Sequence, residues 1–259
     1  QILPLILIII LFLKLKTNPY LIILFLLSPV FIQWSTIGKP LFLGDTCLAL
    51  VYLCWTLDKT NRRLLLYTLI CIICNLSFKI SSVIIILPIF IHLLFFLFSD
   101  LNSNNTIIKF SKYELLILFI PILCLFSLIS MKIYQTGNPF YPFLSAIFTP
   151  DRVDLIDFEG RVRNLFSREQ YFPLSLILPS SPRFIAAVFG PASFLVIIIS
   201  TFTKVFSRNK ILQSMGIVIV SQFILLLLFG QSRADYYACP SILAISGFRV
   251  NPIRYYQIK

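Results

Sequence analysis

Residues 211–229 read ILQSMGIVIVSQFILLLLF, an apolar run without a single charged side chain. A membrane-spanning helix needs about 20 mostly apolar residues, whereas membrane β-strands give short segments of alternating hydrophobicity. The run therefore predicts a transmembrane helix. Lys204, Arg208 and Lys210 precede it and the polar stretch 230–235 follows it, so polar residues mark both of its ends.

The rest of the chain has the same character. Hydrophobic residues make up 58% of the sequence and charged residues 12%, with a mean hydropathy of +0.93. A soluble domain carries about 25% charged residues, so this chain cannot present a polar surface to water on all sides. The composition predicts an all-α polytopic integral membrane protein.

The apolar runs divide the chain into predicted spans. We predict nine transmembrane helices, at 1–13, 19–34, 44–57, 64–78, 83–98, 114–131, 184–203, 211–229 and 236–249. Several are shorter than a full span, and flanking Tyr, Trp, Lys and Arg side chains can reach the interface to compensate. The helices 64–78 and 83–98 are separate only if Phe78–Ser82 is a tight turn. One long helix there would move every later segment to the opposite side of the membrane.

The first predicted span is shorter than the others. The chain begins at Gln1, inside an apolar run, with neither the basic start nor the small-residue cleavage site of a signal peptide. No internal repeat or low-complexity linker divides the sequence. We therefore expect residues 1–259 to form a single transmembrane domain of a longer protein, truncated at its N-terminus.

Lysine and arginine gather in alternate breaks between the apolar runs. The basic breaks contain Lys14, Lys16, Lys59, Arg62, Arg63, Lys109, Lys112, Lys204, Arg208, Lys210, Arg249, Arg254 and Lys259. With three acids these breaks carry a net charge of +10, whereas the other breaks hold nine Lys or Arg against seven acids, or +2. Such a bias places the basic side in the cytoplasm. The total of +12 thus indicates orientation in a bacterial inner membrane and contact with its anionic lipids, and not nucleic-acid binding.

Residues 132–183 form the one long break, which this orientation makes an extracytoplasmic loop. Six prolines make it irregular at both ends, and the middle, Asp151–Glu169, is predicted to be a short surface helix. An acidic cluster of Asp151, Asp154, Asp157 and Glu159 lies there beside Arg152, Arg161, Arg163 and Arg168. The spacing does not match a calcium loop. We interpret the cluster as a salt-bridged surface turn, with divalent metal binding as the alternative.

Charged residues at membrane depth are costly and each needs a reason. Asp45 opens a predicted span, so it is either a helix N-cap or a functional carboxylate. Lys79 has apolar sequence on both sides, and its ammonium group either reaches the interface or holds a lipid-linked phosphate. Arg233 is a similar case, and the guanidinium fork suits a phosphate better than an ammonium group does.

The string Gln135–Phe143, QTGNPFYPF, is the most distinctive local motif. Its Gly-Asn-Pro forces a turn, and the aromatic residues after it suit an interfacial or re-entrant segment. Cys71 and Cys74 form a C-x-x-C without a partner pair, which indicates packing within a span. The single histidine, His92, lies in an apolar run, so a histidine metal site or a Ser-His-Asp triad is not expected.

Four strings in this order resemble the GT-C superfamily of membrane glycosyltransferases, in particular the bacterial group related to protein mannosyltransferases and aminoarabinose transferases. They are Gly44-Asp45-Thr46-Cys47-Leu48-Ala49-Leu50, Leu76-Ser77-Phe78-Lys79-Ile80-Ser81-Ser82 followed by Pro88, Thr136–Phe143, and Gln231-Ser232-Arg233 followed by Pro240. The resemblance covers most of the chain, and the Gly-Asn-Pro-Phe-Tyr-Pro string is its most specific part.

The resemblance implies an enzyme of the cell envelope that takes a sugar from a polyprenyl-phosphate carrier and transfers it to an extracytoplasmic acceptor. The family's catalytic aspartate lies in its first outer loop, for which this chain has no match, and Asp45 is the substitute candidate. Lys79 and Arg233 are the expected phosphate ligands. Further substrate-binding candidates are Gln231, Asn138 and Tyr141. Two other functions remain open: a transporter or flippase for a lipid-linked or small substrate, and a membrane assembly subunit without catalysis.

Overall fold

The fold was analysed in a computed structural model of the chain. It describes residues 6, 9–10, 23, 40–59, 61–78, 82–102, 111–141, 144–167, 177, 191–228 and 237–246. All regular structure within these ranges is helical, as the composition predicts. The helices are α4 (Pro40–Leu57), α5 (Arg62–Phe78), α6 (Val83–Asn102), α7 (Lys112–Thr136), α8 (Ser145–Phe148), α9 (Val153–Ser167), α10 (Pro191–Val205), α11 (Lys210–Leu228) and α12 (Ala238–Ile245).

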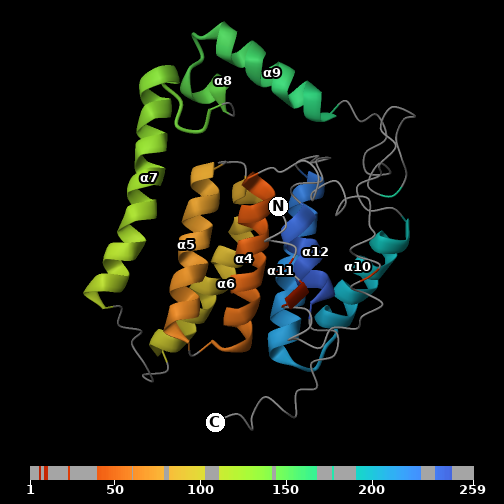
Figure 1. The fold of residues 1–259 in the computed structure, drawn as a ribbon. Helices are drawn as coiled ribbons and strands as arrows, with labels where there is room; N and C mark the ends of the chain where they lie inside the picture. The colour runs from red at the N-terminus through yellow and green to blue at the C-terminus, as the bar shows by residue number, and fades with distance from the viewer. Residues whose placement is uncertain are drawn as a thin grey trace.

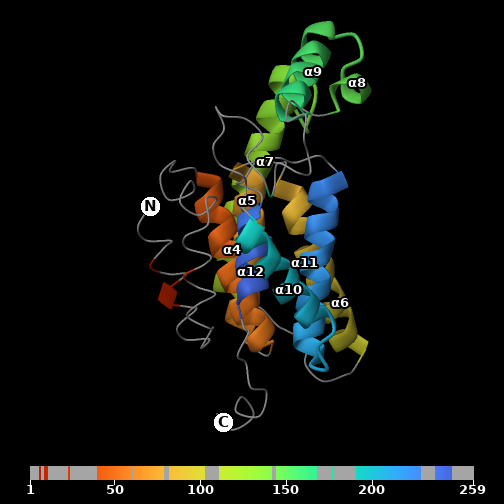
Figure 2. The same cartoon turned by 90° about the vertical axis from the view of Figure 1, so that its right-hand side faces the viewer.

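Six of these helices form a bundle of roughly antiparallel rods (Figure 1). In it α4 packs against α5 and α12, α11 packs against α6, α10 and α12, and α10 packs against α12. Helix α7 packs against α5 at the side of the bundle. Figure 2, turned by 90°, shows α7 continuing past the bundle into α8 and α9.

The short turns between helices are fixed by side chains that cap the next helix. Asn61 accepts hydrogen bonds from the backbone N–H groups of Arg63 (3.1 Å) and Leu64 (3.4 Å) before α5. Ahead of α7, Ser111 and Glu114 form a reciprocal capping box, with bonds of 2.7 and 3.3 Å. These caps satisfy amides that a helix N-terminus leaves without intrahelical partners.

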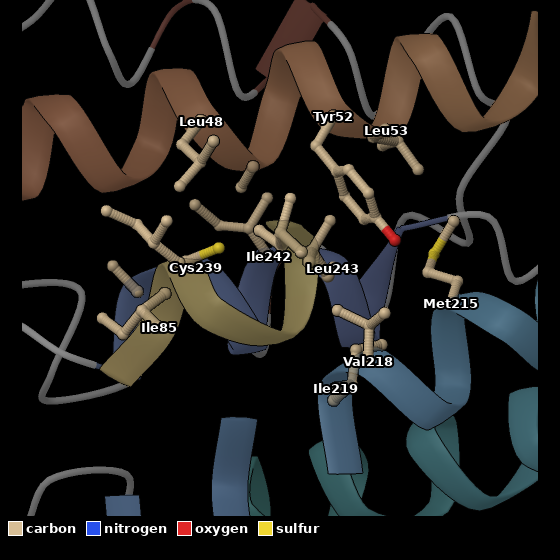
Figure 3. Close-up of a cluster of buried hydrophobic side chains, with 14 of the residues drawn as sticks. Leu48, Tyr52, Leu53, Ile85, Met215, Val218, Ile219, Cys239, Ile242 and Leu243 are labelled. Carbon is tan, nitrogen blue, oxygen red and sulfur yellow. The ribbon is translucent and has the colours of Figure 1, made fainter. Parts of the chain in front are cut away.

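The interior of the bundle is a continuous apolar core. Figure 3 shows Leu48 and Tyr52 of α4 facing Cys239 and Ile242 of α12, with Ile85 of α6 beside Cys239. Met215, Val218 and Ile219 of α11 close the same layer. Every one of these side chains is buried.

The helix positions agree closely with the sequence prediction. The seven predicted spans from 44–57 to 236–249 each overlap a helix. Of 1–13 and 19–34 the structure describes only residues 6, 9–10 and 23, which are helical, and the rest of both spans lies outside the described residues. The prediction of two separate helices here is confirmed as α5, which ends at Phe78, and α6, which begins at Val83, while residues 79–81 of the predicted turn lie outside the described part of the chain. The surface helix within Asp151–Glu169 is confirmed as α9.

Length and apolarity identify two candidate membrane spans among the described residues, Lys112–Thr136 and Lys210–Leu228. Three apolar helices are shorter: Gly44–Leu57, Val83–Phe98 and Pro191–Val205. Along α7, large apolar side chains such as Leu116, Ile120 and Phe126 are exposed. Contact between water and so large an apolar surface is unfavourable, which favours a membrane environment. The number of membrane spans stays a prediction.

Candidate functional site

The bundle has two chemically different ends. At the end where α4 turns into α5 and α10 turns into α11, Lys and Arg dominate; we call it the basic end. Lys59, Arg62, Arg63, Arg208 and Lys210 lie there. The opposite end, where α7 passes into α8 and α9, is the connector end (Figure 1). The structure thus separates the two sets of breaks that the sequence distinguishes.

Five polar side chains are buried inside the bundle near the connector end. They are Asp45 (0% exposed), Thr46 (0%), Asn75 (1%), Ser82 (0%) and Gln222 (0%). We call this group the polar layer. Burying polar groups in an apolar interior costs free energy unless each finds a partner, so five in one region require an explanation.

The directions in which the helices run place these five residues at a similar level along the bundle axis, near the connector end. Helices α4 and α6 begin at the connector end, where Asp45 lies in the second turn of α4 and Ser82 immediately precedes α6. Helices α5 and α11 finish there, with Asn75 in the last turn of α5 and Gln222 in the second-last turn of α11. With a rise of 1.5 Å per residue, all lie within about two turns of the connector end.

Contacts join residues of the polar layer to neighbouring helices. The Gln222 amide Nε2 donates to the Ile85 carbonyl (2.7 Å) and lies 3.6 Å from the Cys239 sulfur. The Cys239 thiol is close enough to the Asp45 carboxylate for the two to interact electrostatically. The Asn75 amide oxygen lies directly against Gly44, where a Cβ atom would overlap it.

Several polar atoms of this layer have no hydrogen-bond partner among the described residues. They are Thr46 Oγ1, both amide atoms of Asn75, Ser82 Oγ and Gln222 Oε1. A buried polar atom left without a partner costs about 1–3 kcal/mol. These particular atoms of Thr46, Asn75, Ser82 and Gln222 therefore carry a desolvation cost that the described part of the chain does not offset.

An apolar layer separates these groups from the basic half of the bundle. One turn further along α4 and α6, Leu48 and Ile85 are buried, and Cys239 and Ile242 of α12 lie close to them (Figure 3).

At the connector end, a compact turn joins α7 to α8. Gly137 caps α7 with a φ of 73°, a left-handed conformation that favours glycine. Asn138 is fully buried, and its side-chain oxygen accepts from the Phe140 N–H (2.8 Å) while its amide nitrogen reaches Ser145 (3.5 Å). Asn138 therefore shapes the turn.

Glu159 of α9 fixes α8. Its carboxylate is 5% exposed and accepts hydrogen bonds from the backbone N–H groups of Leu144 (3.2 Å) and Ser145 (2.7 Å). Leu144 itself has a φ of 60°, a conformation rare for a residue with a side chain. The carboxylate holds a strained turn in place.

Tyr141 also binds within this unit. Its carbonyl accepts a hydrogen bond from the Lys132 ammonium group (2.6 Å), and its ring stacks on Phe158 of α9 with centroids 5.8 Å apart. The sequence proposes Asn138 and Tyr141 as substrate ligands. The structure places both in the contacts that build the connector.

The acidic and basic residues of α9 include one ion pair among those described. Arg152 donates from Nε and Nη2 to the two carboxylate oxygens of Asp154, both at 2.9 Å, as the salt-bridged interpretation predicts. The hydrogen bonds from Arg152 hold the pKa of the Asp154 carboxyl below its usual value. Among the described residues, no three His, Cys, Asp or Glu side chains come together as a metal site.

Of the six site residues that the sequence proposes, Asp45 lies in the polar layer. Lys79, Gln231 and Arg233 lie outside the described residues. Sequence reasoning missed Asn75 and Gln222. The signal was present, because each is an amide inside an otherwise apolar helix, in CIICNLSF and VIVSQFILL.

Two further polar contacts lie toward the basic end. The Tyr52 hydroxyl lies 2.6 Å from His92 Nδ1, and the imidazole ring meets Trp55 edge to face. Lys204, only 3% exposed, donates to the carbonyl of Ala244 near the C-terminus of α12. A cation there is stabilised by the partial negative charge of the helix end. Both contacts join helices that are distant in the sequence.

Comparison with known proteins gives one match. Residues 16–259 match the family described as the DUF1420 N-terminal domain. No curated protein and no solved structure matches the chain.

Proposed function

The chain belongs to the DUF1420 N-terminal domain family, and we propose that it is a membrane-embedded transferase of the GT-C type that moves a sugar from a polyprenyl-phosphate carrier to an acceptor. In this proposal the chain spans a bacterial inner membrane nine times. The basic end faces the cytoplasm, and the chemistry takes place at the connector end.

The observation that carries the proposal is the position of Asp45. A buried carboxylate lies among hydrogen-bonding side chains of three helices at the end of the bundle over which the α8–α9 unit extends. Buried ionisable groups in membrane helices mark functional sites. The charge bias of the basic breaks supports the orientation.

The proposed chemistry follows from the leaving group. When an acceptor hydroxyl attacks the anomeric carbon, the bond to the lipid phosphate breaks and negative charge grows on that phosphate. Fixed cations nearby lower the barrier, and Lys79 and Arg233 are the proposed groups, with Gln231 as a hydrogen-bond donor. Asp45 is the proposed general base for the acceptor hydroxyl, a role worth roughly 10²–10⁴-fold in rate.

The test is a transfer assay with the full-length protein in lipid vesicles containing a polyprenyl-phosphate sugar. Lys79→Ala, Arg233→Ala and Asp45→Asn are each expected to lower transfer by roughly 100-fold or more. Lys112→Ala is the control, since Lys112 is an exposed cation at the basic end. Full transfer by both the Lys79 and Arg233 variants would reject the proposed phosphate site.

One observation favours transport as a second candidate. The polar layer lies inside the bundle, and its side chains have at most 1% exposure, whereas an enzyme site requires access for a bulky substrate. Transporters place polar groups between helices in this way. Uptake or exchange of a labelled substrate by vesicles that show no transfer activity would favour transport.

A further inference from the structure

The short helix α8 presents a strip of apolar side chains on one side. The backbone N–H groups of Ile147 and Phe148 both donate to the Leu144 carbonyl, at 3.0 and 3.1 Å, so one helical turn places the three side chains together. All three side chains are exposed, and Ile147 most of all, at 71%. The exposed Phe140 ring contacts the Phe148 ring, with centroids 5.5 Å apart. We call Phe140, Leu144, Ile147 and Phe148 the apolar strip.

The opposite side of α8 holds the apolar strip in this position. Ser145 is buried there, where its N–H donates to the Glu159 carboxylate of α9 (2.7 Å) and its hydroxyl lies 3.5 Å from the Asn138 amide nitrogen. The same carboxylate binds the N–H of Leu144, whose backbone is left-handed. Strained backbone of this kind persists where surrounding contacts over-determine it, and it clusters at functional sites. The apolar strip thus points away from α9 on a support fixed by buried hydrogen bonds.

The length of α7 indicates the level at which α8 lies. Helix α7 is a candidate membrane span, and Tyr113 (79% exposed) and Tyr134 (91%) mark the two ends of its apolar surface. A rise of 1.5 Å per residue puts these tyrosines about 32 Å apart along the helix, close to the hydrocarbon thickness of about 30 Å. Tyrosine is enriched at both membrane–water interfaces. Figures 1 and 2 both show α8 level with the C-terminal end of α7, and therefore with the interface that Tyr134 marks.

The surroundings of the apolar strip favour lipid over a protein partner. The apolar surface of α7 continues to the same level, since Met131 and Ile133 in its last turns are exposed as well. A stable protein interface takes about 20–30 residues on each side, far more than the strip provides. Side chains that insert into the acyl boundary of a membrane need no matching partner surface.

We propose that the apolar strip inserts into the acyl-chain boundary of the membrane at the connector end, so that α8 docks on the lipid surface. Glu159 of α9 faces α8, and Asp157 lies on the opposite side of α9, where it is exposed. That side of α9 therefore faces water. The inference does not depend on the transferase, because it concerns only the contact between the α8–α9 unit and lipid.

The experiment measures membrane depth with spin labels on the full-length protein in phospholipid vesicles. Each label is attached to a single introduced cysteine in a protein whose six cysteines are replaced. Ile147→Cys tests the strip, Asp157→Cys is the matched control on the far side of α9, and Ile120→Cys marks the exposed middle of α7. Oxygen concentrates in the bilayer and a nickel chelate stays in water, so the ratio of their collision rates with the label reports its depth.

The label at Ile147 is expected about 5–10 Å inside the boundary between headgroups and acyl chains. The label at Asp157 is expected in water, and the label at Ile120 deeper than both. Access of the nickel chelate to Ile147 equal to its access to Asp157 would overturn the proposal. Poor access of both reagents to Ile147 would overturn it too, because a protein surface would then cover the strip.

A second measurement keeps the native cysteines, in case their replacement prevents folding. The photo-crosslinking residue p-benzoylphenylalanine replaces Ile147 in the otherwise unchanged chain, and replaces Asp157 in the control. Illumination in the same vesicles should give phospholipid adducts, detected by mass spectrometry, at position 147 and not at position 157. Adducts to protein alone, or equal lipid adducts at both positions, would contradict the docking. Neither measurement involves a sugar donor, so failure of the docking is distinguishable from failure of the transferase.

Discussion

At the residue scale, Glu159 makes the clearest single contribution among the described side chains. It is a carboxylate almost without exposure whose hydrogen bonds go to two backbone N–H groups, at Leu144 and Ser145. Charge-assisted hydrogen bonds of this kind are about twice as strong as neutral ones. They hold the left-handed Leu144 in its conformation and join α8 to α9.

Glu159→Ala is expected to destabilise the connector by about 1–3 kcal/mol, because the buried Ser145 amide and the partly buried Leu144 amide lose their acceptor. The effect should be local. Hydrogen exchange at Leu144 and Ser145 should accelerate strongly while exchange in α11 stays unchanged. Asp157→Ala, an exposed acid on the same helix, is the matched control and should leave exchange at both amides as it was.

Asp154 gives a prediction about pH. Its pKa is lowered in the folded protein by Arg152, so the pair stabilises the start of α9 fully above the ordinary aspartate pKa of about 3.9. The stabilisation is lost as the pH falls through the lowered folded value. Titration of the carboxyl carbon by NMR should give a midpoint below 3.9, and Arg152→Gln should raise it. An unchanged midpoint in that variant would contradict the pairing.

At the element scale, the backbones of α10 and α11 approach each other closely where the two helices cross. A Cβ atom on Gly216 would come within 2.6 Å of the Val205 backbone nitrogen, and backbone atoms cannot move aside as a flexible side chain can. Lys204 precedes this crossing and also bonds to α12. The close approach thus holds three helices together near the basic end.

Gly216→Ala is therefore expected to destabilise the bundle by about 1–3 kcal/mol through overpacking. Gly160→Ala is the matched comparison, since nothing lies within 4 Å of its added methyl group in α9. Alanine is a better helix former there and should stabilise by up to about 1 kcal/mol. Unfolding midpoints of the two variants should shift in opposite directions. A midpoint equal to wild type for Gly216→Ala would show that the helices move apart freely.

Helix α7 differs from its neighbours in its surroundings. It packs against α5, and its remaining surface of leucine, isoleucine and phenylalanine is exposed. At 25 residues it is about 37 Å long, enough to cross a hydrocarbon core of about 30 Å. Arg62 of α5 pairs with Glu114 at 3.1 Å, which anchors the start of α7 to the basic end.

At the scale of the whole molecule, the two ends of α7 give a direct test of membrane orientation. In a protein whose six cysteines are replaced, Asp157→Cys on α9 should react with an impermeant maleimide in intact cells. Lys112→Cys, at the start of α7, should react only after the cells are permeabilised. The reason is that the proposed orientation, taken from the charge bias of the basic breaks, places the basic end in the cytoplasm. Equal reaction of both from outside would reject the orientation and with it the proposed location of the site.

The sequence by itself determined where the helices lie. The length of an apolar run, the polar breaks and the capping residues are local properties, so α4 to α7 and α10 to α12 could be located from them. Asp45 could be selected as a candidate because a charge within an apolar run is costly. The charge alternation likewise gave two ends before any packing was known.

Only the tertiary structure decided which polar residues share a layer. Asn75 and Gln222 belong to helices distant in the sequence, and the periodicity of a helix indicates a face without indicating its neighbour. The role of Asn138 was also decided by the tertiary structure. Its motif suggested a substrate ligand, whereas its buried side-chain amide shapes a turn. Packing between helices, which no local pattern specifies, brings Asp45 and the two amides together inside an apolar bundle.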